Sequence, residues 1–413
     1  MIGEQTGTPI MTPGVVLRNK TVLICGASIA GPALAYWLNR YGFQVTVVEK
    51  APTLRPGGQA VDFTGETHHR VLEQMGILED VYAHQTGKTD TVFVDADGKQ
   101  VAFMSGDFTG GDVEILRGDL SRIMYETTWQ DCEYIFGDSI GAITETDSDV
   151  WVEFERAAPR RFDLVFGADG IHSRVRRLVF GPEKDFVQHQ GHYYCVVGAS
   201  PWTDTPAGNR DRITSYGHND PGRYAVSGGA KAQQMYLFAS PEIDYPRDDV
   251  AVQRQIVKET FAGMGWRVPD MLAEIDNFDD LYLDAIAKVR KMKSFTRGRV
   301  ALVGDAGYAN TLAGFGTGAA VVGAYVLAGE LARAAGDHTA AFPRYDEVMR
   351  QYSKLSDSAN AGSFLCPKTA RGLRFRNWFL GSKGIGWMEK MAEGSKNLEL
   401  RDYPTLVASA REG

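Results

Sequence analysis

The chain has 413 residues, 44% of them hydrophobic, and a formal net charge of −8. This length can bury a large core and predicts about two or three domains, while the acidic balance gives no reason to expect nucleic acid or an anionic membrane as a partner. Four scattered cysteines form no Cys-x-x-Cys pair and no metal-ligand spacing, so we expect no metal site and interpret them as reduced thiols of a cytoplasmic protein.

The N-terminal region begins with residues 1–19, which are rich in glycine, threonine and proline and contain no long apolar segment. We expect them to form a flexible leader and not a signal peptide. An apolar run of strand length follows at 21–25, and an amphipathic pattern at 32–38 predicts a helix. The turn between them contains Gly26, Ser28 and Gly31.

This strand, turn and helix predict the first half of a βαβ unit that binds a dinucleotide. Backbone N–H groups at a helix N-terminus favour a pyrophosphate, and small residues let the backbone approach it. A second strand at 45–48 ends at Glu49, which follows Gly26 by 23 residues. An acid about 20 residues past the first glycine is typical of a ribose contact. Ser28 stands where glycine is usual, and we expect its small side chain to be tolerated.

The middle of the chain alternates between helical and strand periods. A helix is predicted over 66–84, a hairpin over 92–103 with its turn at 95–98, a helix over 119–127 and a strand over 150–155. The strand at 164–166 leads directly into a second glycine motif, 167–170, which contains Asp169.

Residues 185–290 differ in character, because they contain several alternating segments rich in aromatic residues. They predict a largely antiparallel sheet with one solvated and one buried face. Such a sheet could form the floor of a substrate site.

A third glycine motif opens the C-terminal part. A strand at 300–303 precedes Gly304, Asp305 and Ala306, and an apolar window follows at 315–332. The window contains several glycines and Glu330, so a buried helix is a better interpretation than a membrane span, which needs ~20 mostly apolar residues. A further helix is predicted over 344–352, directly after Pro343.

The order of these motifs resembles one enzyme superfamily. Gly26-x-Ser28-x-x-Gly31 is followed by Arg117-Gly118-Asp119-Leu120, then by Asp163 with Gly167-Ala168-Asp169-Gly170 and Ser173-x-x-Arg176, and finally by Gly304-Asp305-Ala306. Over about 21–352 the chain is similar to the single-component (group A) FAD-dependent monooxygenases. These are aromatic hydroxylases of the para-hydroxybenzoate hydroxylase type, and they include tetracycline-inactivating relatives.

The resemblance implies an α/β fold. A Rossmann-like FAD-binding βαβ domain would be interleaved with a mixed, largely antiparallel substrate sheet and followed by C-terminal helices. The expected boundaries are 1–19 for the leader, 20–184 and 291–352 for the FAD-binding domain, 185–290 for the substrate domain and 353–413 for the C-terminal helical segment.

The resemblance also implies which residues hold the two ends of FAD. Gly26, Ser28 and Gly31 would face the pyrophosphate, and Glu49 would bind the adenosine ribose. Lys50 stands where the family often has arginine.

The remaining cofactor residues come from later parts of the chain. Arg117 would reach the middle of FAD, Asp305 would contact its ribityl and pyrophosphate region, and Asp169 would serve both FAD and NAD(P)H binding. Arg55 and Asp62 are weaker candidates from a glycine loop near the flavin ring, and Gly316 permits a close backbone approach.

By resemblance, NADPH or NADH would reduce FAD, O2 would add to the reduced ring as a hydroperoxide, and the terminal oxygen would hydroxylate a planar aromatic or polyketide-like small molecule. The sequence names no catalytic residue, and we expect a monomer or a homodimer. Candidate substrate contacts are polar and aromatic residues of the predicted sheet, namely His192, Tyr193, His218, Arg223, Tyr224, Tyr236 and Phe238. Ordinary sheet packing is the alternative for each of them, so we expect only a minority to touch substrate.

The segment 308–313 departs from the family pattern, because it contains no proline and is slightly shortened. By resemblance it passes beside the flavin ring, where backbone N–H groups can stabilise negative charge. The departure leaves a second function open, a flavin-binding protein that has lost oxygenation and sequesters or rearranges its ligand.

Overall fold

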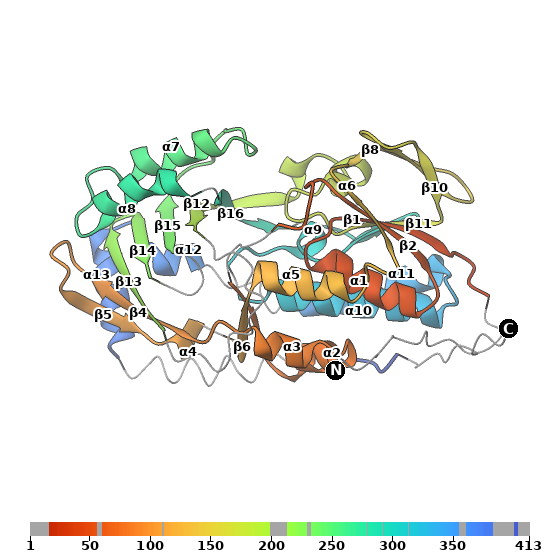
Figure 1. Cartoon of the computed structure of the whole chain (residues 1–413), viewed down its shortest axis with the longest axis horizontal. Coiled ribbons are helices and arrows are strands. Elements are labelled where there is room, and N and C mark those ends of the chain that lie inside the picture. Colours follow the sequence, from red (N-terminus) through yellow and green to blue (C-terminus); the bar gives the residue numbers. More distant parts are fainter. Residues whose placement is uncertain are drawn as a thin grey trace.

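The computed structural model describes residues 16–55, 60–109, 111–198, 213–228, 233–278, 280–290, 292–312, 314–354, 361–382 and 400–403. The expected leader falls outside the described residues except for 16–19, and so does most of the segment 383–413. Two bodies built on separate sheets lie side by side along the long axis (Figure 1).

The first body is built on a six-stranded sheet that is parallel except for one edge hairpin. Its strands, in spatial order, are β17 (Thr296–Arg297), β18 (Val300–Leu302), β11 (Leu164–Gly167), β1 (Thr21–Cys25), β2 (Gln44–Glu49) and β7 (Glu133–Phe136). Only the β17–β18 pair is antiparallel.

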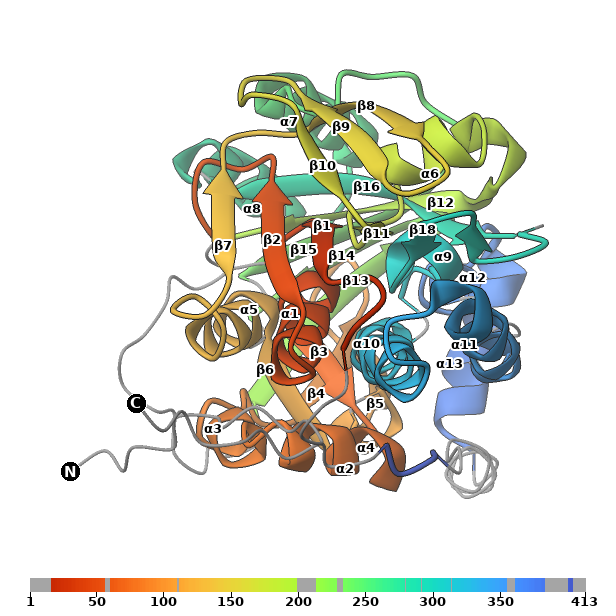
Figure 2. The same cartoon turned by 90° about the vertical axis from the view of Figure 1, so that its right-hand side faces the viewer.

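Layers cover both faces of this sheet (Figure 2). One face carries the helices α1 (Ala30–Arg40), α5 (Arg117–Glu126), α10 (Gly316–Arg333) and α11 (His338–Ser353). The other carries a three-stranded antiparallel sheet, β8 (Ile140–Glu145), β9 (Val150–Phe154) and β10 (Arg160–Phe162), together with α6 (Arg174–Val179). Because both faces are covered, the parallel strands are apolar along nearly their whole length.

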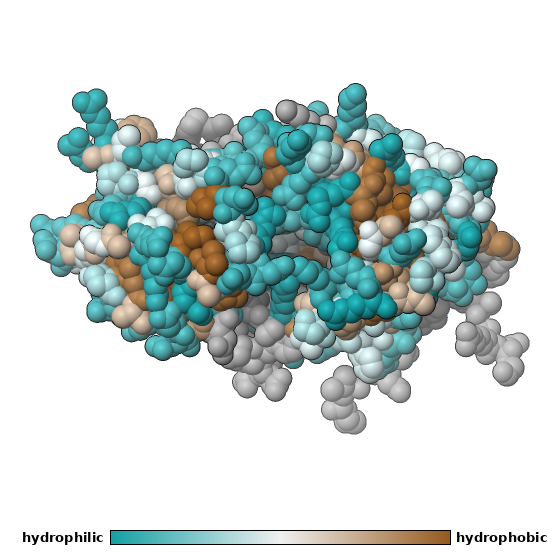
Figure 3. Space-filling model, turned by 90° about the horizontal axis from the view of Figure 1, so that it is seen from above, coloured by the Kyte–Doolittle hydropathy of each residue, from teal (hydrophilic) through white to brown (hydrophobic). Residues whose placement is uncertain are grey.

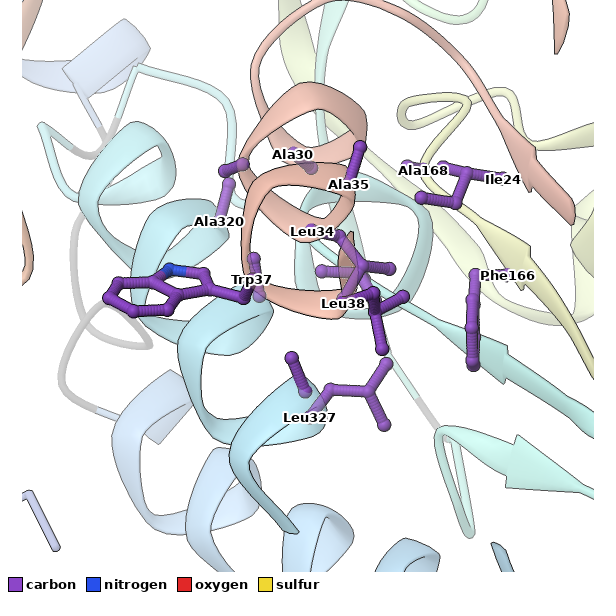
Figure 4. Packing of buried hydrophobic residues seen from close by; sticks show 14 of the residues in the cluster. Ile24, Ala30, Leu34, Ala35, Trp37, Leu38, Phe166, Ala168, Ala320 and Leu327 are labelled. Carbon is purple, nitrogen blue, oxygen red and sulfur yellow. The ribbon is translucent and has the colours of Figure 1, made fainter. Parts of the chain in front are cut away.

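Helix α1 lies between the sheet and α10, and this position explains its composition. Leu34 and Leu38 point toward the strands near Phe166, and Trp37 lies against α10 (Figure 4). The rings of Trp37 and Tyr325 meet edge to face with their centroids 5.0 Å apart. Small alanines along the rest of α1 let the two helices approach closely.

The second body is built on a seven-stranded sheet. Its strands, in spatial order, are β16 (Leu281–Val289), β12 (Val187–Val197), β15 (Gln234–Ala239), β14 (Arg223–Ser227), β13 (Ile213–Asp220), β4 (Thr89–Val94) and β5 (Gln100–Met104). All neighbours are antiparallel except β4 and β13. The predicted hairpin at 92–103 is therefore confirmed, and it completes a sheet whose other strands come from 187–289.

The expectation of one solvated face on this sheet is wrong, because the central strands are buried on both sides. Helices α7 (Val250–Phe261) and α8 (Val268–Glu274) cover one face, where Tyr193, Tyr236 and Phe238 pack. Helices α12 (Ala361–Leu365) and α13 (Ala370–Leu380) cover part of the other face. Residues of β12 alternate between the two faces, as the strand period requires.

Two predicted helices have different bounds in the structure. The helix expected over 66–84 is broken into α2 (Glu66–Gln74) and α3 (Leu78–Ala83), because Gly76 adopts φ +73° and ends the first of them. Helix α11 begins at His338, before the predicted start, because the Asp337 side chain accepts a hydrogen bond from the Thr339 N–H. Pro343 therefore lies inside the helix.

The remaining elements are short. They are β3 (Ala60–Phe63) paired with β6 (Val113–Leu116), α4 (Gly106–Thr109), α9 (Asp305–Tyr308), and the 3₁₀ turns Glu183–Asp185 and Ile275–Asn277. Among the described helices, none is long and apolar enough to cross a membrane. Seen from above, the surface carries its hydrophobic residues in separate patches among polar ones (Figure 3).

Candidate functional site

The three glycine motifs converge at one edge of the six-stranded sheet. The register pairs Cys25 with Gly167 and Gly167 with Leu302, so the last residues of β1, β11 and β18 lie side by side. Each motif begins at one of these strand ends or within two residues of it. Ligands of open α/β sheets bind outside the carboxyl ends of the strands, and this edge is therefore the candidate site.

The turns approach one another so closely that only glycine fits. A Cβ on Gly26 would lie 2.5 Å from the Ala168 carbonyl oxygen, and the residue adopts φ +108°. A Cβ on Gly31 would lie 1.8 Å from the Gly26 carbonyl oxygen. Gly304 adopts φ +64°, and a Cβ added there would lie 3.0 Å from the Ala30 Cβ.

Two long helices point their N-termini at this edge without a side-chain cap. Neither α1 nor α10 has a side-chain hydrogen bond at its N-cap or an acidic residue in its first turn. By contrast, the side chains of Asp249, Asp337 and Thr369 cap α7, α11 and α13. Uncapped N–H groups and the helix dipole suit an anion such as a pyrophosphate.

Glu49 lies at the end of β2, beside the first turn. One carboxylate oxygen accepts a hydrogen bond from the Ala27 N–H at 2.8 Å, and the other accepts one from the Ala51 N–H at 2.9 Å. These two bonds hold the partly buried carboxylate next to the place where the turn would receive a dinucleotide.

Arg117 and Asp305 bring opposite charges to the same edge. Arg117 donates from Nε and Nη2 to Ser28 Oγ, at 3.1 and 3.0 Å. Asp305 is accessible to solvent, and a Cβ on Gly316 would lie 3.5 Å from its Oδ1. Desolvation by the surrounding protein raises the pKa of the Asp305 carboxyl, and the positive charge of Arg117 partly opposes this rise.

Asp169 uses both of its carboxylate oxygens within the protein. Oδ1 accepts from Ser173 Oγ at 2.5 Å, while Oδ2 accepts from the N–H groups of Arg174 and Val175 at 2.6 and 3.1 Å. Burial raises the pKa of Asp169 despite these bonds. The carboxylate therefore anchors the start of α6 at the second turn.

The three remaining cofactor candidates follow Glu49 along the chain. Lys50 pairs with the Asp248 carboxylate at 3.0 Å on the exposed surface, and Asp62 accepts a hydrogen bond from the Gly111 N–H at 3.2 Å. Arg55 is exposed at the start of the glycine loop, whose residues 56–59 lie outside the described part of the chain.

The candidate substrate residues have the contacts of a packed core. Tyr193, His218, Arg223, Tyr236 and Phe238 belong to strand positions that face α7 and α8. The Tyr193 and Phe238 rings stack with centroids 5.6 Å apart, and Arg223 donates to the carbonyl oxygens of Thr260 and Ala262. His218 donates from Nδ1 to the Val94 carbonyl oxygen at 3.0 Å, because a carbonyl oxygen only accepts.

The other two candidates lie on the opposite face, under α12 and α13. His192 bonds the Cys366 carbonyl oxygen through Nε2 at 3.1 Å, and Tyr224 stacks on Phe93 with centroids 5.5 Å apart. Sheet packing, the alternative given in the sequence analysis, thus accounts for the observed contacts of all seven residues.

A polar cluster that no sequence motif predicted lies where the two bodies meet. It consists of His172, directly after the second glycine motif, with Glu183, Tyr282 and Asp284. Burial raises the pKa of the neighbouring Tyr194, and the charges of Asp284, Arg117 and Asp305 also act on this pKa. The cluster therefore borders the candidate site.

A separate hollow of about 450 Å³ lies between α10, α11 and residues 400–403. Its buried carboxylate, Glu330, accepts hydrogen bonds from Arg333, Arg401 and Tyr403. Glu330 lies about 21 Å along α10 from Gly316, at about 1.5 Å per residue. This hollow is thus not part of the sheet edge.

A family model described as "FAD binding domain" matches residues 19–346, about four-fifths of the chain. The chain is 40% identical over 402 residues to a flavin-dependent monooxygenase from an unknown prokaryotic organism, covering 94% of this chain and 100% of the relative. It belongs to this FAD-dependent monooxygenase family.

Solved structures agree with this membership. The monooxygenase is similar to the tetracycline destructase Tet(55), with 34% identity, a TM-score of 0.75 and coverage of 95% of this chain and 100% of that chain. It also shares its fold with Klebsiella pneumoniae HpxO, solved with FAD and uric acid, at 20% identity, a TM-score of 0.68 and coverage of 91% and 96%.

The residues of the monooxygenase fit FAD. The glycine turns leave no side chain between the backbone and a pyrophosphate, and the uncapped N-termini of α1 and α10 supply donors for it. A carboxylate for a ribose, Glu49, and a guanidinium for phosphate oxygens, Arg117, lie at the same edge.

Proposed function

We propose that this monooxygenase uses NADPH or NADH to reduce its FAD, and O2 to hydroxylate a planar aromatic or polyketide-like small molecule. The observation that carries the proposal is the convergence of Ser28, Glu49, Arg117 and Asp305 at one sheet edge that faces the second sheet. The likeness to a tetracycline destructase supports a polycyclic polyketide as the first substrate class to test.

Each polar residue has a proposed role toward the cofactor. Ser28 and Arg117 bind the pyrophosphate, Glu49 binds the adenosine ribose hydroxyls, and Asp305 binds the ribityl hydroxyls. The N-terminus of α10 stabilises negative charge on the reduced ring. When bound, FAD supplies the redox and oxygen-transfer chemistry, and the hydroperoxide route is part of the proposal.

The second sheet supplies the surface opposite the flavin. Tyr194 and Tyr282 lie on the face of β12 and β16 toward Arg117, with ring centroids 6.0 Å apart. Aromatic faces suit a flat ligand, and their hydroxyl groups can orient it. We therefore propose these two tyrosines as substrate-side residues ahead of the seven sequence candidates.

The proline-free segment is held by hydrogen bonds to the second sheet. The Thr311 N–H donates to the Ala287 carbonyl oxygen at 3.0 Å, and the Val289 N–H donates to the Ala309 carbonyl oxygen at 2.9 Å. A proline at 311 would remove the first of these bonds. The segment thus has its own support from β16, although Ala313 lies outside the described residues.

The test is reduction and oxygenation by the purified, FAD-loaded chain. We expect NADPH or NADH to bleach the flavin absorbance without oxygen, and to do so faster when tetracycline or another planar aromatic from a small panel is present. In air with ¹⁸O₂, the accepted compound should gain one labelled oxygen atom by mass spectrometry.

Two results would contradict the proposal. A yellow protein that neither nucleotide reduces would favour the ligand-sequestering alternative. A colourless protein that does not bind added FAD would contradict both functions.

A further inference from the structure

His172 lies between two carboxylates that come from different parts of the molecule. Its Nε2 is 3.0 Å from Asp284 Oδ1, on β16 of the second sheet, and its Nδ1 is 3.0 Å from Glu183 Oε1, in the turn after α6. His172 itself follows the second glycine motif of the first body by two residues. One ring thus joins the cofactor edge to the second sheet.

The geometry requires a doubly protonated ring. An ionised carboxylate only accepts hydrogen bonds, so both ring nitrogens of His172 must donate. Burial alone would lower the pKa of His172, but the hydrogen bonds to Asp284 and Glu183 outweigh it and raise the pKa. An imidazolium is the form that satisfies both contacts.

The two carboxylates respond in the opposite sense. Burial would raise the pKa of Asp284, which is only 6% exposed, but the hydrogen bond and charge of His172 outweigh burial and lower it. Burial would likewise raise the pKa of Glu183, but His172, with Arg247 and Arg176, lowers it to about 2. Each of the three groups thus favours the charged form of its partners.

Further groups complete the surroundings of the ring. On β16, the Tyr282 hydroxyl donates to Asp284 Oδ2 at 2.6 Å. On α6, Arg177 donates to the His172 carbonyl oxygen at 2.7 Å, and it lies 3.5 Å from Glu183. Before α7, Arg247 lies 3.4 Å from Glu183. His172 is thus the cation that links the Asp284–Tyr282 pair on one side to Glu183 and its two arginines on the other.

The cluster reaches the flavin edge through β16. Asp284 holds the Tyr282 hydroxyl, and the Tyr282 ring meets the Tyr194 ring. The negative charges of Asp284 and Asp305 act on each other. Desolvation by the surrounding protein raises the pKa of the Asp305 carboxyl, Arg117 opposes this rise, and the charge of Asp284 adds to it. A shift of β16 would therefore move the tyrosines relative to the cofactor.

We propose that protonated His172 is a positioning residue that holds β16, and with it Tyr282 and Tyr194, against the flavin edge. This inference rests on the proposed function, because the tyrosines matter only if FAD reacts at that edge. When His172 loses a proton, one ring nitrogen turns a lone pair toward a carboxylate. That contact becomes repulsive, and the link between the two bodies weakens as the pH rises through the pKa of His172.

The first measurement needs no turnover. Long-range ¹H–¹⁵N spectra of the eight histidines, with His172→Gln for assignment, report the pKa of His172 directly. We expect it above the ordinary value of about 6.5, and we expect Asp284→Asn to lower it. A pKa at or below the ordinary value would overturn the proposal.

The second measurement uses bound FAD. The visible circular dichroism of the FAD-loaded protein and its rate of reduction by NADPH are followed across pH. Both should change through the pKa of His172 in the wild type, and neither should change there in His172→Gln. At low pH the variant should reduce FAD more slowly by on the order of tenfold to a hundredfold, which is typical of a displacement of about 1 Å.

A matched control is His84→Gln. His84, at the end of α3, contacts the Asp80 carbonyl oxygen through Nδ1 at 2.8 Å, and its replacement should leave both profiles as in the wild type. If His172→Gln fails to fold, the change in both profiles should move to lower pH in Asp284→Asn, together with the lowered pKa of His172, and an unmoved profile would overturn the proposal. Wild-type profiles in folded His172→Gln would overturn the positioning role. If NADPH and NADH both fail to reduce wild-type FAD, the proposed function fails, while the dichroism and the histidine titration still decide this inference.

Discussion

At the scale of single residues, the Glu49 carboxylate is held in place within the proposed cofactor site. It receives N–H groups from both the first glycine turn and the end of β2, so its position is set before a ribose arrives. The cost of ordering this group is thus met by folding and not by ligand binding.

We predict that Glu49→Ala weakens FAD binding roughly 10- to 150-fold, because a hydrogen bond to a charged group contributes about 1.5–3 kcal/mol. Fluorescence titration of the apoprotein with FAD measures this. Glu49→Gln, which keeps one acceptor oxygen, should lose less. Glu153→Ala, an exposed change on β9, serves as the control and should leave the affinity as in the wild type. Equal affinities for Glu49→Ala and Glu153→Ala would contradict the assignment of Glu49.

A second residue-scale prediction concerns Gly31. Its added Cβ would lie 1.8 Å from the Gly26 carbonyl oxygen, so Gly31→Ala must push the helix away from the turn. We expect a loss of stability of at least about 1–3 kcal/mol and poor FAD retention, measured by urea unfolding and by flavin absorbance after purification. Gly381→Ala is the control, because a Cβ at this position would lie 3.6 Å from its nearest neighbour, the Trp378 carbonyl oxygen. This variant should behave as the wild type. Full flavin occupancy in Gly31→Ala would show that the turn opens without cost.

The sequence pointed to residues that meet at one sheet edge but not to the pair of His172 and Asp284, and the reason is physical. Glu49 lies at a set distance from its glycine turn, so a local motif predicts it. His172 and Asp284 are 112 residues apart, and no local pattern pairs them. Alternation in β12 shows that Tyr193 and Tyr194 face opposite ways. It does not say which of the two faces meets the other body, so the strand pattern gave no reason to prefer Tyr193 to Tyr194.

At the scale of elements, helices α1 and α10 differ from α7 in how their first N–H groups are satisfied. Helices α1 and α10 have no side-chain caps, whereas Asp249 accepts hydrogen bonds from the Ala251 and Val252 N–H groups at the start of α7. The first N–H groups of α1 and α10 therefore stay available for an anion, whereas those of α7 are used within the protein.

We predict that Asp249→Ala destabilises the protein by about 1 kcal/mol, within a range of about 0.5–2. Helix α7 would lose the acceptor for its first N–H groups while FAD affinity stays as in the wild type. Asp249→Asn keeps an acceptor oxygen and should recover most of the loss in urea unfolding. Equal stabilities of the Ala and Asn variants would show that the cap contributes nothing.

Most elements were predicted from periodicity, and the errors lie at their ends. The apolar pattern over 66–84 continues through Gly76, although its positive φ ends the helix there. Pro343 suggested a helix start, but the cap at Asp337 starts α11 earlier and the proline is tolerated inside. The two-sided burial of the second sheet depended on α7, α8, α12 and α13 packing on it, which strand periodicity cannot reveal.

At the scale of the whole molecule, the ionic link at His172 makes the stability depend on pH. A histidine with a raised pKa stabilises the fold fully below its unfolded pKa, and this contribution is lost as the pH rises through the folded pKa. The lowered pKa values of Asp284 and Glu183 act at the other end, where stability is lost as the pH falls.

We therefore predict that this link contributes most between the unfolded pKa values of the carboxyl groups, about 4, and of histidine, about 6.5. The melting temperature of His172→Gln should fall furthest below that of the wild type within this window, and the difference should shrink above it. Thermal unfolding followed by circular dichroism over a pH series measures this. A difference that is constant with pH would contradict the ionic account.

The parallel pairing of β4 with β13 has a consequence for biosynthesis. Strand β4 ends at Val94, and the strand that covers its open edge begins at Ile213. A ribosome that adds about 5–20 residues per second needs roughly 6–24 s to deliver the missing partner. During that interval the hairpin presents an unsatisfied backbone edge to the cell, so newly made chains should depend on chaperones until Asp220 has emerged.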